Sequence, residues 1–176
     1  MRRIAFLLLF NVAIVATALY GTGDVWATPA VGFAATTLVE GPLAEINVLN
    51  KSIVPNSSED DRRAKGWLSL QKTSGSSYLY VQNNVWQPGG TTGWHTHPGY
   101  SLIIVTAGTV TDYDGSDPDC KPHVYTKNME FVDHGGSHIH AIRNEGNIVA
   151  QTTAIQLIPT GAARRIDVAD PGNCRF

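Results

Sequence analysis

Two histidines one residue apart, His95 and His97, constrain this sequence more than any other feature. In a β-strand, residues two apart point to the same face of the sheet, whereas on a helix this spacing turns them away from each other. The flanks favour the strand, because Gly, Thr and Trp precede the pair and Pro98-Gly99 makes a turn directly after it. Two imidazoles on one strand face are half of a transition-metal site.

Further imidazoles follow at the distance of about one circuit of a small barrel. All six histidines of the chain lie between positions 95 and 140, and His138 and His140 repeat the one-residue spacing. His123 precedes an expected strand and should be exposed. His134 lies in an Asp-His-Gly-Gly turn, where we expect it at the rim of a site and not among its ligands.

The order of these residues resembles the cupin superfamily, over roughly residues 67–158. The resemblance implies an all-β domain, a single jelly-roll barrel (a double-stranded β-helix) that holds a metal inside. The first motif would supply two histidine ligands and the second motif one. The residues that carry the resemblance are Gly89, His95, His97, Gly108, His140 and Asn144.

The second motif points to His140 as the third ligand, because His140 has the family's three-residue gap to Asn144. His138 lies on the same strand face and could replace it. The motif departs from the family pattern at its start, where Asn128 and His134 stand in place of the usual Gly and Pro.

The first motif lacks the carboxylate that the family usually provides. Four residues after His97, where the family has Glu, this chain has Ser101, and neither Tyr100 nor Leu102 is an acid. The resemblance therefore implies three histidine ligands and no carboxylate, with Ser101 facing the interior. We expect Trp94 and Tyr100, beside Ser101, to line the pocket.

Length, composition and charge agree with one β domain. The chain has 176 residues, enough for a single packed core, and 17 Gly and 9 Pro residues separate short runs rich in Val, Ile, Thr and Tyr. No long segment after the leader has a helical apolar period. A net charge of −2 without a basic block argues against a nucleic-acid partner.

Residues 1–27 are predicted to be a signal peptide, with a charged start, an apolar core and a small-residue cleavage pattern at Ala27. Residues 28–36 are expected to form a tether, and residues 37–176 the barrel domain with its C-terminal tail. The chain should be secreted or reside in the periplasm or cell envelope, without a stable membrane span after cleavage. An uncleaved anchor is the alternative.

The two cysteines support export. Cys120 and Cys174 each follow a polar, turn-like run, and an even number of cysteines in an exported chain predicts a disulfide. Two thiolate metal ligands are the alternative, which we disfavour because neither cysteine is close in sequence to a motif histidine.

Two classes of function stay open. Three neutral imidazoles leave coordination positions free, so Fe, Zn, Mn or Ni could support a dioxygenase or isomerase of a small molecule. The alternative is a non-catalytic protein of the cell envelope that binds metal or a small ligand. A small-molecule ligand is the expected partner, and a homodimer is left open.

Overall fold

The computed structural model describes residues 27–54 and 65–176, and in these ranges it contains strands and no helix. The predicted signal peptide thus lies outside the described residues except for Ala27. No helix of the described part has the length and apolar character needed to cross a membrane. The strands are β1 (Val31–Leu43), β2 (Asn47–Val54), β3 (Lys65–Lys72), β4 (Ser77–Thr91), β5 (His95–Thr96), β6 (Ser101–Ala107), β7 (Thr109–Asp114), β8 (His123–Thr126), β9 (Glu130–Asp133), β10 (His140–Arg143), β11 (Ala150–Pro159) and β12 (Ile166–Asp167).

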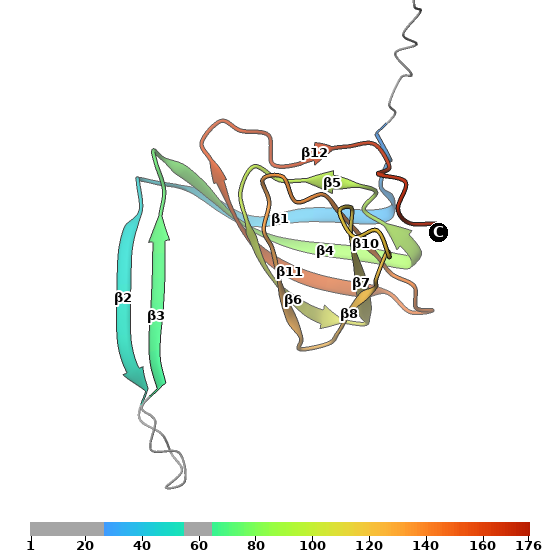
Figure 1. Cartoon of the computed structure of the whole chain (residues 1–176), viewed down its shortest axis with the longest axis horizontal. Coiled ribbons are helices and arrows are strands. Elements are labelled where there is room, and N and C mark those ends of the chain that lie inside the picture. The colour runs from blue at the N-terminus through green and yellow to red at the C-terminus, as the bar shows by residue number, and fades with distance from the viewer. Residues whose placement is uncertain (1–26, 55–64) are drawn as a thin grey trace, which may run out of the picture.

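Ten of these strands form two antiparallel layers of a barrel (Figure 1). One layer has the order β1-β4-β11-β6-β9 and the other has the order β12-β5-β10-β7-β8. The layers join where the end of β4 reaches β10, at the pair Thr91 and Arg143. The predicted all-β jelly-roll barrel is therefore confirmed.

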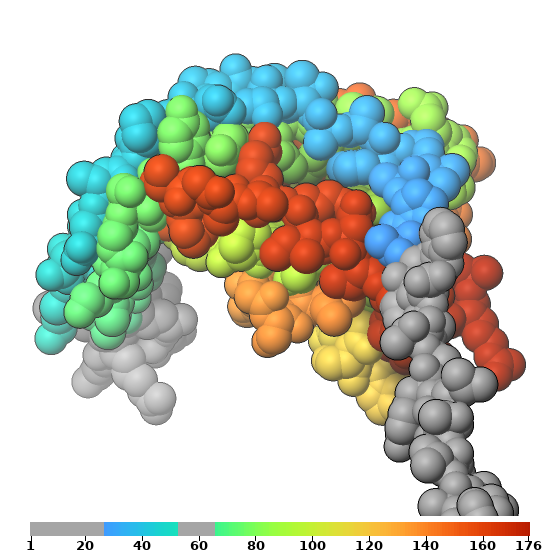
Figure 2. Space-filling model, turned by 90° about the horizontal axis from the view of Figure 1, so that it is seen from above, coloured from blue at the N-terminus to red at the C-terminus, as the bar shows by residue number. Residues whose placement is uncertain are grey.

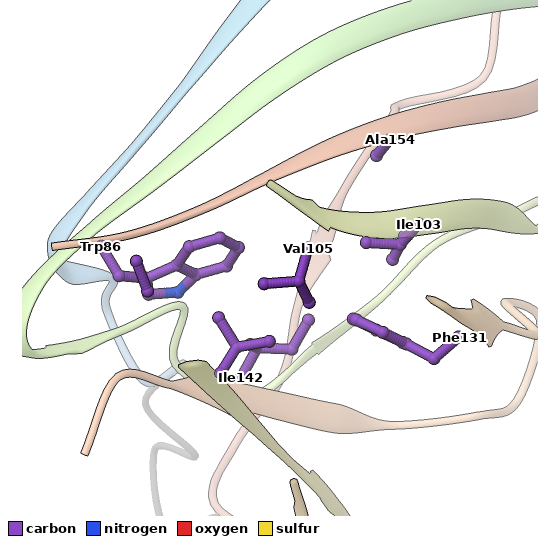
Figure 3. Packing of buried hydrophobic residues seen from close by; sticks show 8 residues of the cluster. Trp86, Ile103, Val105, Phe131, Ile142 and Ala154 are labelled. Carbon is purple, nitrogen blue, oxygen red and sulfur yellow. The ribbon is translucent and has the colours of Figure 1, made fainter. Parts of the chain in front are cut away.

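Period-two alternation along the strands builds the interior. In β6, Ser101, Ile103 and Val105 are buried, whereas Leu102 and Ile104 between them are exposed. Inward-facing apolar side chains from both layers meet in one cluster, as Figure 3 shows for Trp86, Val105 and Ile142. Burial of this apolar surface is the main force that holds the two layers together.

The N-terminal boundary of the barrel differs from the sequence expectation. Residues 31–36, expected to belong to a tether, pair with β4 as the first half of β1. The reason is Phe33, whose ring packs on buried Trp86 at 4.9 Å between centroids. Gly41-Pro42, a pair of residue types that often marks a turn, lies within the same strand.

Strands β2 and β3 stand outside the barrel as a hairpin of their own (Figure 1). The expected barrel domain, residues 37–176, therefore contains this insertion between β1 and β4.

A disulfide joins Cys120, in the loop after β7, to Cys174 in the C-terminal tail, with 5.2 Å between Cα atoms. Cys174 is buried beside Trp94, Tyr113 and Ala141. The predicted bridge is therefore present in the structure, and a disulfide is typical of exported proteins. It ties the segment that follows β11 to the opposite layer.

We expect Gly99→Ala to destabilise the barrel strongly. A Cβ at Gly99 would lie 1.9 Å from the carbonyl oxygen of Leu157, a backbone atom that cannot move away without disturbing β11. Overpacking of this kind typically costs about 1–3 kcal/mol. Gly41→Ala is the matched control, since a Cβ there meets nothing within 4 Å. Urea unfolding of both variants measures the difference, and equal midpoints would contradict this packing.

Candidate metal centre

The three predicted ligand histidines meet at one place inside the barrel. His95 on β5 pairs directly with His140 on β10, and His97 follows β5 by one residue. The ring of His95 lies 4.8 Å from that of His97 and 4.5 Å from that of His140, between centroids. All three line an internal cavity of about 190 Å³, and each offers a nitrogen within 4.8 Å of the others.

Each of the three rings has a hydrogen-bond acceptor at Nδ1. The acceptors are the Gly93 carbonyl for His95 at 3.0 Å, the Arg164 carbonyl for His97 at 2.5 Å, and the Asp112 carboxylate for His140 at 3.0 Å.

A ring that donates its Nδ1 proton keeps a free lone pair on Nε2, and such outer partners fix metal-ligand histidines in their orientation. The Nε2 atom of His140 is fully buried and has no hydrogen-bond partner among the described residues. An orphaned acceptor of this kind fits a metal ligand.

Sequence analysis missed a fourth polar group in the cavity, Asp133 on β9. Its Oδ2 lies 3.5 Å from Nε2 of His97 and 3.8 Å from Nε2 of His140. Its Oδ1 accepts a hydrogen bond of 2.9 Å from the Gly135 amide, which holds the carboxylate in place.

The expectation of a site without a carboxylate is therefore corrected. Ser101 does face the interior, where its hydroxyl lies 3.4 Å from Asp133, its direct partner in the β6–β9 pair. An acid thus enters from the neighbouring strand. The alternation of Glu130-Phe131-Val132-Asp133 was the available signal, because it places Asp133 on the same inner face as Phe131.

Burial and local charge keep these groups in the protonation states that bind cations. Burial, together with the charges of His140 and Arg165, lowers the pKa of His95 to about 2. Burial also lowers the pKa of His97. For Asp133, burial alone would raise the pKa, but the close contact with His138 and the nearby imidazoles of His140 and His97 outweigh it and hold the pKa below its usual value. Neutral imidazoles and an ionised carboxylate are a suitable donor set for a divalent transition metal.

His138, the substitute ligand, lies beside the site and not on its cavity. Its side chain is partly exposed, with Nδ1 3.6 Å from Asp133 and Nε2 3.8 Å from Asp114. These contacts raise the pKa of His138, and the close approach of the Asp133 carboxylate is the largest cause. Asp133, His138 and His140 form a second group close enough to hold a cation. His138 therefore lies next to the three-histidine site without lining its cavity.

Two of the three expected pocket residues lie elsewhere. Trp94, in the bend directly before β5, is buried in a separate cluster with Tyr113 and Cys174. Tyr100 follows the turn at Gly99, and its hydroxyl accepts a hydrogen bond from Gln71 on β3. Neither side chain lines the cavity.

The rest of the cavity wall combines an apolar floor with two arginines. Arg165 donates to the Thr92 carbonyl at 2.5 Å and pairs with Asp167. Arg164 donates to Thr37 at 2.8 Å and stacks on the ring of Tyr80. Apolar side chains from both layers close the floor: Phe33, Trp86, Ile103, Ile142 and Ala154.

Comparison with known proteins gives structural neighbours only: no protein-family model and no curated protein matches the sequence. A cupin superfamily protein from Desulfitobacterium hafniense is 13% identical, with a TM-score of 0.39 over 64% of this chain and 79% of that one. The polyketide cyclase RemF from Streptomyces resistomycificus is 14% identical, with a TM-score of 0.44 over 53% and 64%. An oxalate oxidase is 21% identical, with a TM-score of 0.43 over 51% of this chain and 46% of that one, less than half its length. One of these structural neighbours is thus described as a cupin superfamily protein.

We expect the metal-free protein to lose stability as the pH falls from 7 to 5. The folded state keeps His95 neutral down to about pH 2, whereas the unfolded chain binds a proton near the ordinary pKa of 6.5. Between these values the unfolded state binds more protons than the folded state. The unfolding free energy therefore decreases as the pH decreases, and His95 contributes up to about 1.4 kcal/mol per pH unit. His97, with its lowered pKa, acts in the same direction, and His138, with its raised pKa, opposes it.

Urea unfolding in the presence of a chelator at both pH values measures this loss. His95→Gln should reduce it, and an unchanged pH dependence in that variant would contradict the burial of a neutral ring.

Proposed function

We propose that the barrel interior is a centre for a divalent transition metal, with His95, His97 and His140 as ligands and the Asp133 carboxylate beside them. We further propose that the protein is an exported metal-dependent enzyme that acts on a small anionic molecule. One observation carries the proposal. Three imidazoles, each with an acceptor at Nδ1, converge with an ionised carboxylate on a cavity that has room for a further ligand.

The donor set fits Fe, Zn, Mn or Ni, and sequence and geometry favour none of them. Histidine and carboxylate ligands suit all four, and three or four protein ligands leave positions open. A metal bound there would supply Lewis-acid or dioxygen chemistry. The outer acceptors orient the imidazoles, and the Gly135 amide orients Asp133.

The cavity itself argues for a small anion. Its volume of about 190 Å³ corresponds to roughly six waters. Arg164 and Arg165 bring positive charge to its wall, and among the described residues Asp133 is the only acid that lines it. The low polarity of the apolar side chains beside them strengthens the attraction between these arginines and a negatively charged ligand. A carboxylate would meet both the metal side and the arginine side of the cavity.

Export is supported by the Cys120–Cys174 disulfide, which forms in oxidising compartments. The alternative function, metal or ligand binding without turnover, shares the same centre. Conversion of a small carboxylate by metal-loaded protein, lost in His140→Gln, would separate the two.

Metal affinity tests the ligand set directly. Competition of the metal-free protein with a chromophoric chelator for Zn²⁺ should show a loss of at least about 100-fold in affinity for His140→Gln. It should show about 10–100-fold for Asp133→Asn. His123→Gln is the matched control, because His123 is exposed on β8 and should leave the affinity unchanged.

A carboxylate exchange sharpens this test. Ser101 and Asp133 are direct partners across β6 and β9, so Ser101→Glu in the Asp133→Asn background returns a carboxylate to the cavity from the other strand. We expect it to recover part of the lost affinity. Zn²⁺ binding that survives His140→Gln unchanged would overturn the centre, and an unaffected Asp133→Asn would remove the carboxylate from it.

Anion binding has its own readout. In the Co²⁺-loaded protein, acetate and malonate should change the visible spectrum at lower concentrations than the neutral analogue acetamide. Arg165→Gln should weaken the response to both anions about tenfold while Co²⁺ affinity stays the same, because the arginine contacts the ligand and not the metal. An equal response to acetamide would contradict an anionic ligand.

A further inference from the structure

The β2–β3 hairpin leaves the barrel after β1 and returns to it at β4 (Figure 1). In the space-filling view one end of the hairpin touches the barrel, and beyond this contact an open space lies between the hairpin and the barrel (Figure 2). Both of its strands pair only with each other among the described residues. An isolated two-stranded hairpin is marginally stable in water, so this one needs a surface to pack on.

One face of the hairpin carries three leucines that are open to solvent, together with Lys51 and Lys72. Leu49 on β2 is the direct partner of Leu70 on β3, and Leu68 lies two residues from Leu70 on the same side. Their exposed fractions are 68%, 68% and 66%. We call these three residues the leucine face. Gln71 lies on the opposite face, and its bond to Tyr100 turns that face toward the barrel.

A second exposed apolar surface crosses the outside of the barrel. The register aligns five residues from five neighbouring strands in one row on the outer face of the layer β1-β4-β11-β6-β9. We call this row the apolar stripe. Its members are Val39, Val81, Ile155, Leu102 and Val132.

Four of the five stripe residues are exposed, and Val81 between them is half-buried. Leu102 and Val132 are 48% and 46% exposed, and Ile155 is 43% exposed. With neighbouring strands about 4.8 Å apart, the row is about 19 Å long. Contiguous apolar surface of this kind on a soluble chain marks an interaction site.

We infer that the leucine face of one chain packs on the apolar stripe of a second copy, and that the contact is reciprocal in a homodimer. Both surfaces belong to the same chain, so a two-fold axis lets each copy give one hairpin and receive one, and all four surfaces are covered at once. Among residues 27–54 and 65–176, no segment of the same chain covers the leucine face, and the four stripe residues other than Val81 are exposed.

The size and the charges of the leucine face and the apolar stripe are consistent with a second copy of the chain as the partner. Each strand of the hairpin has eight residues, about 27 Å in length, so one face of the ribbon covers about 250 Å². Two hairpins and two stripes together bury about 1,000 Å², which is the lower bound for a specific interface. Lys51 and Lys72 flank the leucine face, and Glu130 lies beside the stripe on the same outer face of β9, so the charges at the rim are complementary.

Sedimentation velocity of the purified chain at about 1–100 µM tests the proposal. The unaltered chain should sediment as a dimer. Leu70→Lys on the leucine face and Leu102→Glu on the stripe should each raise the dimer dissociation constant at least about 100-fold, because each buries a charge in an apolar contact. Val124→Lys is the control, since Val124 is 50% exposed on β8 in the other layer and should leave the dimer intact.

The double variant Leu70→Lys with Leu102→Glu tests which surfaces meet. Opposite charges would then face each other across the contact, and dimerisation should recover in part. Zn²⁺ affinity equal to that of the unaltered chain shows that every variant is folded. A monomer at 100 µM would overturn the inference. A dimer that survives Leu70→Lys but not Leu102→Glu would also overturn it, because the stripes would then pack on each other.

Discussion

The pairing of the short strands β5 and β10 decides the geometry of the metal centre. β5 contains only two residues, and it is held in place by β10 on one side and by β12 on the other. The direct pair of His95 with His140 brings the two motifs together, and the Arg164 carbonyl just before β12 fixes the ring of His97. Because β12 belongs to the C-terminal tail, the disulfide that anchors this tail also supports the ligand geometry.

The carboxylate of the site comes from Asp133 on β9, although the sequence resemblance points to position 101 on β6 for an acid. Ser101 and Asp133 are cross-strand partners on one inner face, so an acid on either strand reaches the same region of the cavity. A buried carboxylate needs compensation, which the Gly135 amide and the surrounding imidazoles give to Asp133. In return, the carboxylate offers a cation an opposite charge that three neutral rings alone do not supply.

In the layer β1-β4-β11-β6-β9, alternate residues of the same strands form the wall of the cavity on one side and the solvent-exposed outer face on the other. On β6, Ser101 and Ile103 face the cavity, whereas Leu102 faces solvent in the apolar stripe. Polar residues usually cover the solvent side of such a sheet. The apolar row on this one, together with the leucine face of the hairpin, links the site to the assembly proposed for the chain, because both faces depend on one register.

The sequence by itself determined what short-range spacing controls. One-residue spacing predicted the shared face of His95 and His97, alternation and turns predicted a domain of short strands, and the cysteine count predicted the disulfide. The jelly-roll barrel was implied by the resemblance to the cupin superfamily. Tertiary structure decided what depends on pairing between distant strands. Asp133 lies 32 residues from Ser101 and became its partner only through the β6–β9 register. Residues 31–36 form a strand because Phe33 packs on Trp86. Trp94 does not line the cavity because it packs in a separate cluster with residues of other segments. Contacts of this range follow from the pairing of strands within a layer and from the packing of side chains inside the barrel, and both depend on residues that are distant in sequence.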